Sequence, residues 1–291
     1  MEVSVVIPTL NRINDIKECI SALEKQDLPK KKFEIIVVGN GSIDGSKEFL
    51  KEKADEGRIR FLEEKKKGPG AARNLGVNKS RARFIAFTDD DCLPEPSWLS
   101  ELLNAFPEDR KCAAVGGPVV TAHKKNIISR YCDYCRACIG LDFKGRAIHL
   151  STMNSLYRRS ALLDVGIFDE RVIGVEDIHL SQKIIRKGYY LKNLGKGTVF
   201  HKDPKDLGTL YRRAWLQGKG IAIVAKMQGV KLEKGRITAV REILFPKRYA
   251  RDYAETGKQT LYEKLVFGFL HRLWKLGVHN GYSNEMRRSH L

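Results

Sequence analysis

The N-terminal third of the chain alternates short apolar runs with stretches of helical spacing, and this order constrains the fold more than any other feature. We expect strands at 3–7, 33–38, 58–62 and 83–87, with helices between them at 11–26, 46–54 and 70–80. Strands that return to one sheet through a helix run parallel to each other. The sequence therefore predicts an α/β domain with a mostly parallel sheet flanked by helices.

The alternation loosens after Ala113–Val120, which indicates that a second lobe begins near there. A helix is expected over 97–106 and another over Asp177–Arg186, followed by strands near 189–194 and 198–201. From about Asp206 to the C-terminus we expect a largely helical extension.

Three adjacent carboxylates, Asp89, Asp90 and Asp91, follow the apolar run 83–87. Ligands of parallel sheets bind beyond the carboxyl ends of the strands, so this loop is a candidate site. Asp89 and Asp91 have the D-x-D spacing, which points two side chains the same way in extended backbone. Such a pair can hold a hard divalent cation such as Mg²⁺ or Mn²⁺. The alternative is a solvated acidic turn, and the position after a buried strand favours the metal site.

Two glycine-containing loops lie earlier in the chain. The stretch 35–46 reads IIVVGNGSIDGS, but its glycine spacing is one residue too long for a dinucleotide fingerprint, and it follows the second strand. A tight turn with glycines at positive φ is the alternative. The stretch 65–76 reads KKKGPGAARNLG, where a helix N-terminus could bind an anion and Arg73 could bind phosphate.

Three further titratable residues are candidates. Glu176 and Asp177 precede a helix, where a carboxylate is either an N-cap or a general base that takes a proton from a nucleophile. His201 ends the run GTVFH, and it is either a structural histidine or a metal ligand.

Taken in order, these segments resemble the family-2 glycosyltransferases with the Rossmann-like GT-A fold. The matching stretches are VSVVIPTLNR, GNGSIDGS, GPGAARNLG, FIAFTDDDCLPEPSWL, MNSLYRRSALLDVGIFDE, GVEDIHLSQKIIRKGY and VFH, which together cover about residues 3–201. Each is modest alone, and their common order makes the resemblance specific.

The resemblance implies roles for individual residues. Contacts to a nucleotide-diphospho-sugar would come from Pro8, Thr9, Asn40, Arg73, Asn74, Asp89 and Asp90. The ligands of Mg²⁺ or Mn²⁺ would come from Asp89, Asp91 and His201. Asp177 matches the catalytic base of the family, with Glu176 as its companion.

The resemblance also implies a domain order and a reaction. Residues 1–115 would bind the nucleotide-sugar, 116–205 the acceptor, and 206–291 would form a basic helical region. The reaction would be metal-dependent inverting transfer from a UDP-, GDP- or dTDP-sugar to a hydroxyl or phosphate of a glycan or a lipid-linked acceptor.

One departure from the family motivates a second hypothesis. Gly39-Asn40 stands where the family usually has an acidic pair, one member of which accepts a hydrogen bond from uracil N3–H. Asn40 could accept only through its uncharged amide oxygen. The donor nucleotide therefore stays open, and a nucleotide-sugar-binding protein without catalysis is the alternative.

The formal charge of +18 indicates polyanionic partners, and much of the excess lies in residues 206–291. Arg212 and Arg213 could contact phosphate or face solvent. The stretch 261–278 combines apolar residues with Lys264, Arg272 and Lys275, which suits either an anionic membrane surface or packing on the domain or a partner. The chain lacks recognisable nucleic-acid modules, so nucleic acid is not expected as a partner.

We find no signal peptide and no uncharged apolar run long enough to span a membrane. We therefore expect the protein in the cytoplasm, either free or at the inner face of the cell membrane. Cysteines would then be reduced thiols. Cys132, Cys135 and Cys138 form C-x-x-C-x-x-C, which is either a metal site lacking an evident fourth ligand or three small residues along one side of a helix.

Overall fold

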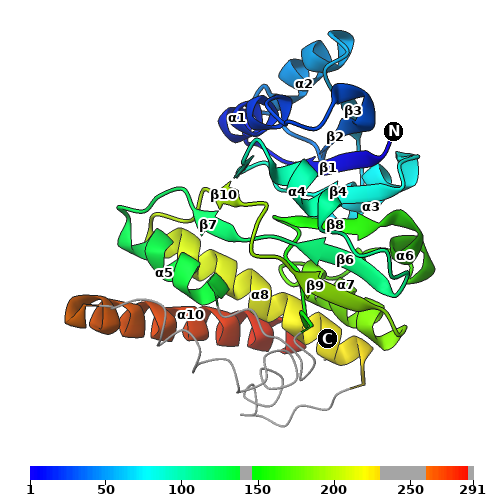
Figure 1. Ribbon diagram of the computed structural model, residues 1–291. Helices are drawn as coiled ribbons and strands as arrows, with labels where there is room; N and C mark the ends of the chain where they lie inside the picture. The colour runs from blue at the N-terminus through cyan, green and yellow to red at the C-terminus, as the bar shows by residue number, and fades with distance from the viewer. Residues whose placement is uncertain (138–145, 230–259, 288–291) are drawn as a thin grey trace. The chain divides into compact units, whose positions relative to one another are not determined.

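The structure is a computed structural model that describes residues 1–137, 146–229 and 260–287 (Figure 1). Its contacts divide the chain into two compact units. The sheet unit comprises Met1–Val120, Asp142–Glu170 and Leu180–His201, and the helical unit comprises Thr121–Leu141, Arg171–His179 and Lys202–Leu291. These units divide the chain differently from the predicted segments, because residues 116–205 contribute to both.

The described strands of the sheet unit form a main sheet of seven. Their order is β3 (Arg60–Glu63), β2 (Phe33–Gly39), β1 (Val3–Thr9), β4 (Phe84–Phe87), β8 (Ser155–Arg158), β6 (Cys112–Gly116) and β9 (Tyr190–Asn193). The strands β3, β2, β1 and β4 run parallel to one another, whereas β8 runs antiparallel to both β4 and β6. The predicted mostly parallel α/β sheet is confirmed, and β8 is an element that the sequence analysis missed.

A smaller sheet brings together strands that are far apart in the chain. Its order is β5 (Cys92–Pro94), β10 (Val199–His201) and β7 (Val119–Thr121). Because β5 and β10 run antiparallel with Cys92 opposite His201, the end of β10 lies beside the start of β5. The acidic loop that precedes β5 therefore acquires a histidine neighbour.

The central strands of the main sheet are buried on both faces. Along β1 the side chains of Val3, Val5 and Ile7 enter one hydrophobic cluster, and Val6 enters another, as the period of two in a strand requires. The helices of this unit are α1 (Ile13–Glu24), α2 (Ser46–Asp55), α3 (Pro69–Lys79), α4 (Trp98–Asn104), α6 (Arg159–Asp164) and α7 (Glu176–Arg186), whose first turn belongs to the helical unit.

Glycines shape two positions that matter for the site. Gly41 and Gly45 have φ of 89° and 88°, so the 39–46 loop is the tight turn that the sequence offered as one reading. Gly76 lets α3 pack directly on β1, since a Cβ there would lie 2.4 Å from a methyl group of Val6.

The helical unit is built from α5 (Ile127–Ala137), α8 (Leu207–Met227) and α10 (Leu261–Arg287), which confirms a helical C-terminal region over the described residues. Val175, Ala214, Val278 and Tyr282 are among the buried residues of one cluster. A second cluster joins α5 to the other two helices through residues that include Tyr131, Leu210, Phe267 and Leu270.

Two ion pairs tie α5 into this unit. Arg136 pairs with the buried Asp203 at 2.5 Å, and Arg130 pairs with Glu263 at the start of α10. Cys132 is buried on α5, Cys135 lies one turn on, and Cys138 lies outside the described residues. No helix within the described ranges is long and apolar enough to cross a bilayer.

Candidate active site

The loop after β4 directs its three carboxylates to three different partners. Thr88 anchors the loop by donating a hydrogen bond from Oγ1 to the carbonyl of Met153 at 3.0 Å. Asp89 accepts from Arg73, Asp90 from Thr9, and Asp91 from Arg12. Adjacent like charges are therefore separated and each meets a donor, which lets three carboxylates coexist on one loop.

Asp90 is the buried member, with 6% of its surface exposed. Burial raises the pKa of Asp90 to about 7, against the opposing effects of Arg12 and of the Thr9 hydrogen bond. The Thr9 Oγ1 donates to Asp90 at 2.8 Å, so both residues are occupied with each other beneath the loop. Their predicted contact with the donor would be indirect in this arrangement.

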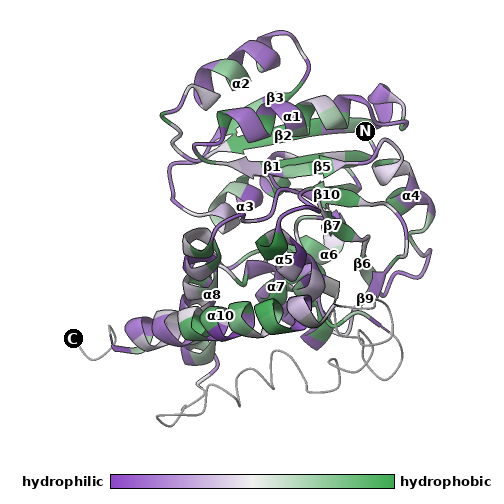
Figure 2. Cartoon of the chain, turned by 90° about the vertical axis from the view of Figure 1, so that its left-hand side faces the viewer, coloured by the Kyte–Doolittle hydropathy of each residue, from purple (hydrophilic) through white to green (hydrophobic). Residues whose placement is uncertain are grey.

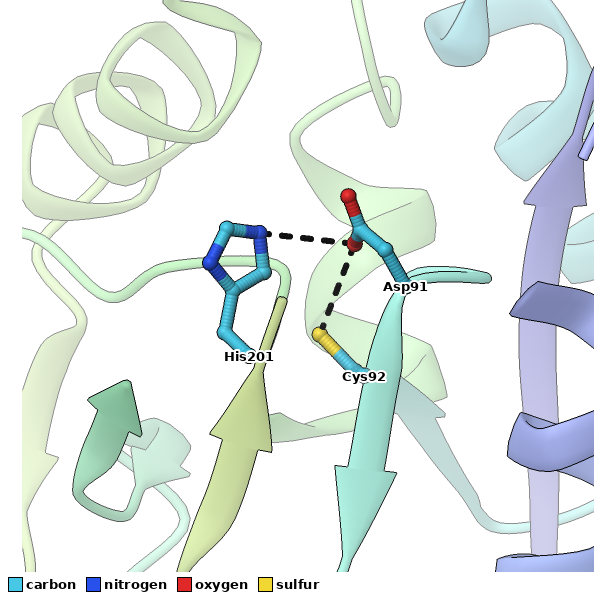
Figure 3. Close-up of side chains that lie close together, drawn as sticks. All are labelled: Asp91, Cys92 and His201. Carbon is cyan, nitrogen blue, oxygen red and sulfur yellow. Dashed lines mark hydrogen bonds and ion pairs between the residues drawn. The ribbon is translucent and has the colours of Figure 1, made fainter. Parts of the chain in front are cut away.

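Asp91 lies where the two sheets meet. Its Oδ1 is 3.4 Å from His201 Nε2 and 3.8 Å from Cys92 Sγ (Figure 3). Its Oδ2 accepts from Arg12, whose Nη1 also lies 3.5 Å from Asp90. Burial works against the charge of Arg12, but Asp91 and Asp90 outweigh burial and raise the pKa of this arginine.

The ligand atoms of Asp91, Cys92 and His201 all lie within 4.8 Å of one another, so together they could hold a metal ion. Burial, followed by the charges of Asp91 and Asp89, raises the pKa of the Cys92 thiol well above its usual value. Without a metal the thiol is therefore protonated, and a sulfur ligand is in any case softer than the ligands that Mg²⁺ or Mn²⁺ prefers. The carboxylate and the imidazole remain, and this oxygen-and-nitrogen pair could hold Mn²⁺ or Mg²⁺.

Asp89, the other predicted metal ligand, has a different partner. Its Oδ1 accepts from Arg73 at 2.6 Å, and it is absent from the three-residue metal group found in the described part of the chain. Arg73 is itself buried, with its guanidinium 5.7 Å from the ring centroid of Phe168. In the structure Asp91 therefore lies beside His201, whereas Asp89 forms an ion pair with Arg73.

Asn74 and Asn40 hold loops in place. The Asn74 amide exchanges two 3.0 Å hydrogen bonds with the backbone of Phe168 and donates another to Glu170. The Asn40 amide donates to the carbonyls of Glu64 and Lys66 and accepts from Gly68 N–H at 2.7 Å. The amide oxygen of Asn40, which was expected to accept a hydrogen bond from the nucleotide base, therefore already accepts one from the backbone.

The end of β1 is joined to the 41–46 turn. Pro8 precedes Thr9 at the end of the strand, and Asn11 follows with φ of 53°. The Asn11 Oδ1 accepts from Ile43 N–H, and Asp44 accepts from Ile13 N–H at the start of α1. The loops after β1 and β2 therefore support each other at the carboxyl edge of the sheet.

Glu176 and Asp177 begin α7 in the helical unit. One carboxylate oxygen of Asp177 accepts from the N–H of Ile178 at 2.8 Å. This bond satisfies one of the free N–H donors in the first turn of the helix. The role of Asp177 as a general base stays a prediction.

Sequence reasoning missed Arg12 and Cys92. Arg12 closes the stretch VSVVIPTLNR directly after β1, and its place in a loop at the carboxyl edge was the signal that could have identified it. Cys92 follows Asp91 and becomes a neighbour of the histidine only through the β5–β10 pairing.

Comparisons with known proteins identify the family of the chain. Glycosyl transferase family 2 matches residues 4–166. The glycosyltransferase AglE of Haloferax volcanii is 28% identical over 236 residues, covering 80% of this chain and 77% of its own length. The minor teichoic acid biosynthesis protein GgaA of Bacillus subtilis is 26% identical over 226 residues, covering 74% of this chain and 50% of its own.

Solved structures share the fold. The mannosyltransferase PcManGT from Pyrobaculum calidifontis, in complex with GDP-Man and Mn²⁺, has a TM-score of 0.66 at 19% identity, over 98% of this chain and 87% of its own. TarS 1–349 of S. aureus in complex with UDP has a TM-score of 0.58 at 18% identity, over 100% and 92%. The expected GT-A fold is confirmed, and the chain is a glycosyltransferase that belongs to glycosyl transferase family 2.

Proposed function

We propose that this chain transfers a sugar, with inversion, from a nucleotide-diphospho-sugar to an acceptor hydroxyl, assisted by Mn²⁺ or Mg²⁺. One observation supports the metal and the donor together. Asp91 and His201 converge on a potential cation position beyond β4, while Arg73 and Arg12 place two guanidinium groups on the same acidic loop.

Asp91 and His201 would hold the cation, and Asp89 would reach it only by leaving Arg73. The bound metal would offset the charge that develops on the departing nucleoside diphosphate. Arg73 pairs with Asp89 and Arg12 pairs with Asp91 of the acidic loop. Either arginine could turn its guanidinium fork toward a phosphate. Asn40 and Asn74 would serve by holding the loops that surround the donor.

Asp177 would act as the general base, with Glu176 beside it. The acceptor oxygen forms a bond to the anomeric carbon while the bond from that carbon to the diphosphate oxygen breaks. The hydroxyl proton passes to the Asp177 carboxylate. Attack opposite the leaving group inverts the anomeric configuration.

The donor nucleotide and the acceptor are proposed only as classes. GDP-Man and UDP are bound by the two structural neighbours, and GgaA takes part in teichoic acid biosynthesis. These relatives favour a GDP- or UDP-sugar, with a dTDP-sugar as a further choice, and a glycan or lipid-linked acceptor. We expect the reaction to take place in the cytoplasm or at the inner face of the cell membrane.

A thermal-shift screen with UDP-, GDP- and dTDP-sugars, each with and without Mn²⁺, tests the proposal. A ligand that binds the folded state raises the melting temperature by mass action. We expect one donor class to raise it with Mn²⁺, and we expect Asp91→Asn to lose that increment while its own melting temperature stays close to the parent's. If Asp91→Asn keeps the full Mn²⁺-dependent increment, Asp91 is not a metal ligand. Donor binding without any donor turnover would favour the non-catalytic alternative.

A further inference from the structure

The helix α10 presents a stripe of apolar side chains to solvent. Tyr262, Leu265, Phe269 and Leu276 are 67%, 68%, 58% and 51% exposed. At about 100° per residue these four positions fall within an arc of about 60°, so they form one line along the helix. Exposed apolar residues that are gathered in this way mark an interaction surface.

The opposite side of α10 is fully used by the helical unit. Phe267, Leu270 and Val278 are buried against α5 and α8. Gly281 lies so close to α8 that an added Cβ would meet the carbonyl oxygen of Trp215 at 1.9 Å. The exposed stripe is therefore not the side on which this helix packs within its unit.

Cations line one edge of the stripe. Lys264, Arg272 and Lys275 are exposed and lie within the next roughly 100° of the helix surface. The exposed residues of the described helix include no Asp or Glu, since Glu263 is buried against Arg130 and Glu285 lies near Lys219 and Lys226. Hydrophobic and hydrophilic residues alternate along α10 in Figure 2.

We propose that this face of α10 docks the enzyme on the surface of an anionic lipid bilayer. The helix has 27 residues and is about 40 Å long, so it can lie in the plane of the interface. Tyr262, Leu265, Phe269 and Leu276 would enter the boundary between headgroups and acyl chains. Lys264, Arg272 and Lys275 would contact lipid phosphates. This inference rests on α10 and is independent of the donor, the metal and the catalytic residues.

Vesicle co-sedimentation of the full chain tests the proposal, with phosphatidylcholine vesicles compared to phosphatidylcholine vesicles that contain phosphatidylglycerol. We expect binding to the anionic vesicles, weakened by added salt. The triple substitution Lys264→Gln, Arg272→Gln, Lys275→Gln should lower the partition coefficient about fivefold for each cation removed. Leu265→Ser with Phe269→Ser should also lower it, because the apolar contribution is lost.

A charge-matched control separates this face from the overall basicity of the protein. Lys31→Gln, Lys51→Gln, Arg81→Gln removes three exposed cations from the sheet unit and should leave vesicle binding close to the parent's. Equal losses in both triple variants, or unchanged binding in the α10 variants, would overturn the proposal. So would a parent dimer that Leu265→Ser with Phe269→Ser dissociates, since a second copy would then cover the stripe. All variants change exposed side chains, and melting temperatures verify that they fold.

Discussion

The two carboxylate oxygens of Asp91 have different neighbours, and one of these neighbours would compete with a bound cation. Oδ1 faces His201, whereas Oδ2 holds Arg12, so a guanidinium already occupies part of the position that a metal would use. Arg12 thus stabilises the carboxylate charge without a metal and opposes a dication electrostatically.

Replacing Arg12 by Gln should therefore strengthen metal binding. Removal of one positive charge beside the site should lower the dissociation constant for Mn²⁺ about tenfold or more in the absence of donor. Titration followed by the electron paramagnetic resonance of Mn²⁺ measures it directly. Arg58→Gln removes another arginine that pairs with two carboxylates and should change nothing. Weaker Mn²⁺ binding in Arg12→Gln would show that the arginine supports the site and does not compete for it.

Asp90 gives a prediction about pH. Burial raises its pKa to about 7, whereas an unfolded Asp titrates near pH 3.9. Between these values the folded chain holds one more proton than the unfolded chain, so this residue makes the free energy of unfolding fall as pH rises. Asp90→Asn removes that effect. Its stability relative to the parent should rise through this window by about 1 kcal/mol per pH unit, and level off above it.

Urea unfolding of both proteins in buffers that contain EDTA measures this difference. A constant difference between pH 4 and pH 8 would mean that Asp90 is ionised in the fold throughout, as a strong pairing with Arg12 would produce.

For individual residues, the sequence predicted which ones lie close together more successfully than it predicted the role of each. The D-x-D at a strand end and the histidine of VFH were predictable, and Asp91 and His201 do meet. The same sequence could not show that Asn40 and Asn74 hold loops in place, because their backbone partners lie 24 to 94 positions away. The contact of Arg12 with the acidic loop was not predicted, because it depends on the direction in which a loop residue points its side chain.

Among the elements, the α8–α10 pair depends on glycines where the two backbones come close. A Cβ on Gly281 would lie 1.9 Å from the Trp215 carbonyl oxygen, and one on Gly218 would lie 2.0 Å from that of Val278. Neither obstacle is the movable end of a side chain. These helices can therefore accommodate larger residues only by separating.

Gly281→Ala should lower the free energy of unfolding by about 1–3 kcal/mol, the usual effect of overpacking, or by more if the helices part. Gly268→Ala on the same helix is the matched control, because nothing lies within 4 Å of its added Cβ. The control should be more stable than the parent by up to about 1 kcal/mol through helix propensity. Comparable stability of the two variants in chemical unfolding would contradict the close packing of α8 on α10.

The elements were largely predictable where their pattern is local. The expected strands and helices of the first ninety residues all appear, with ends shifted by at most two positions. The strand β8 was missed, because SLYR is short and its antiparallel place between β4 and β6 depends on pairing that no local pattern records. The β5–β10 pair was missed for the same reason.

Across the whole molecule, the residues proposed for the reaction are divided between the two compact units. Asp91, His201 and Arg73 belong to the sheet unit, and Glu176 and Asp177 belong to the helical unit. We propose that donor binding depends on the first set and proton transfer on the second, so a substitution of Asp177 should leave donor binding intact.

Asp177→Asn tests this division and the proposed mechanism most directly. The amide keeps the shape of the side chain but cannot take a proton. The measurement is the rate of sugar transfer, using the donor from the thermal-shift screen and an acceptor that the parent glycosylates. Nucleotide binding by calorimetry is measured on the same preparation. Asp206→Asn, at the N-cap of α8, is the matched control for capping.

If Asp177 is the base, turnover in Asp177→Asn falls by a factor on the order of 10²–10⁴, while Mn²⁺-dependent nucleotide affinity stays near the parent's and Asp206→Asn remains active. Turnover close to the parent's in Asp177→Asn would contradict the mechanism, because Asn caps a helix as well as Asp does and the residue would then be structural.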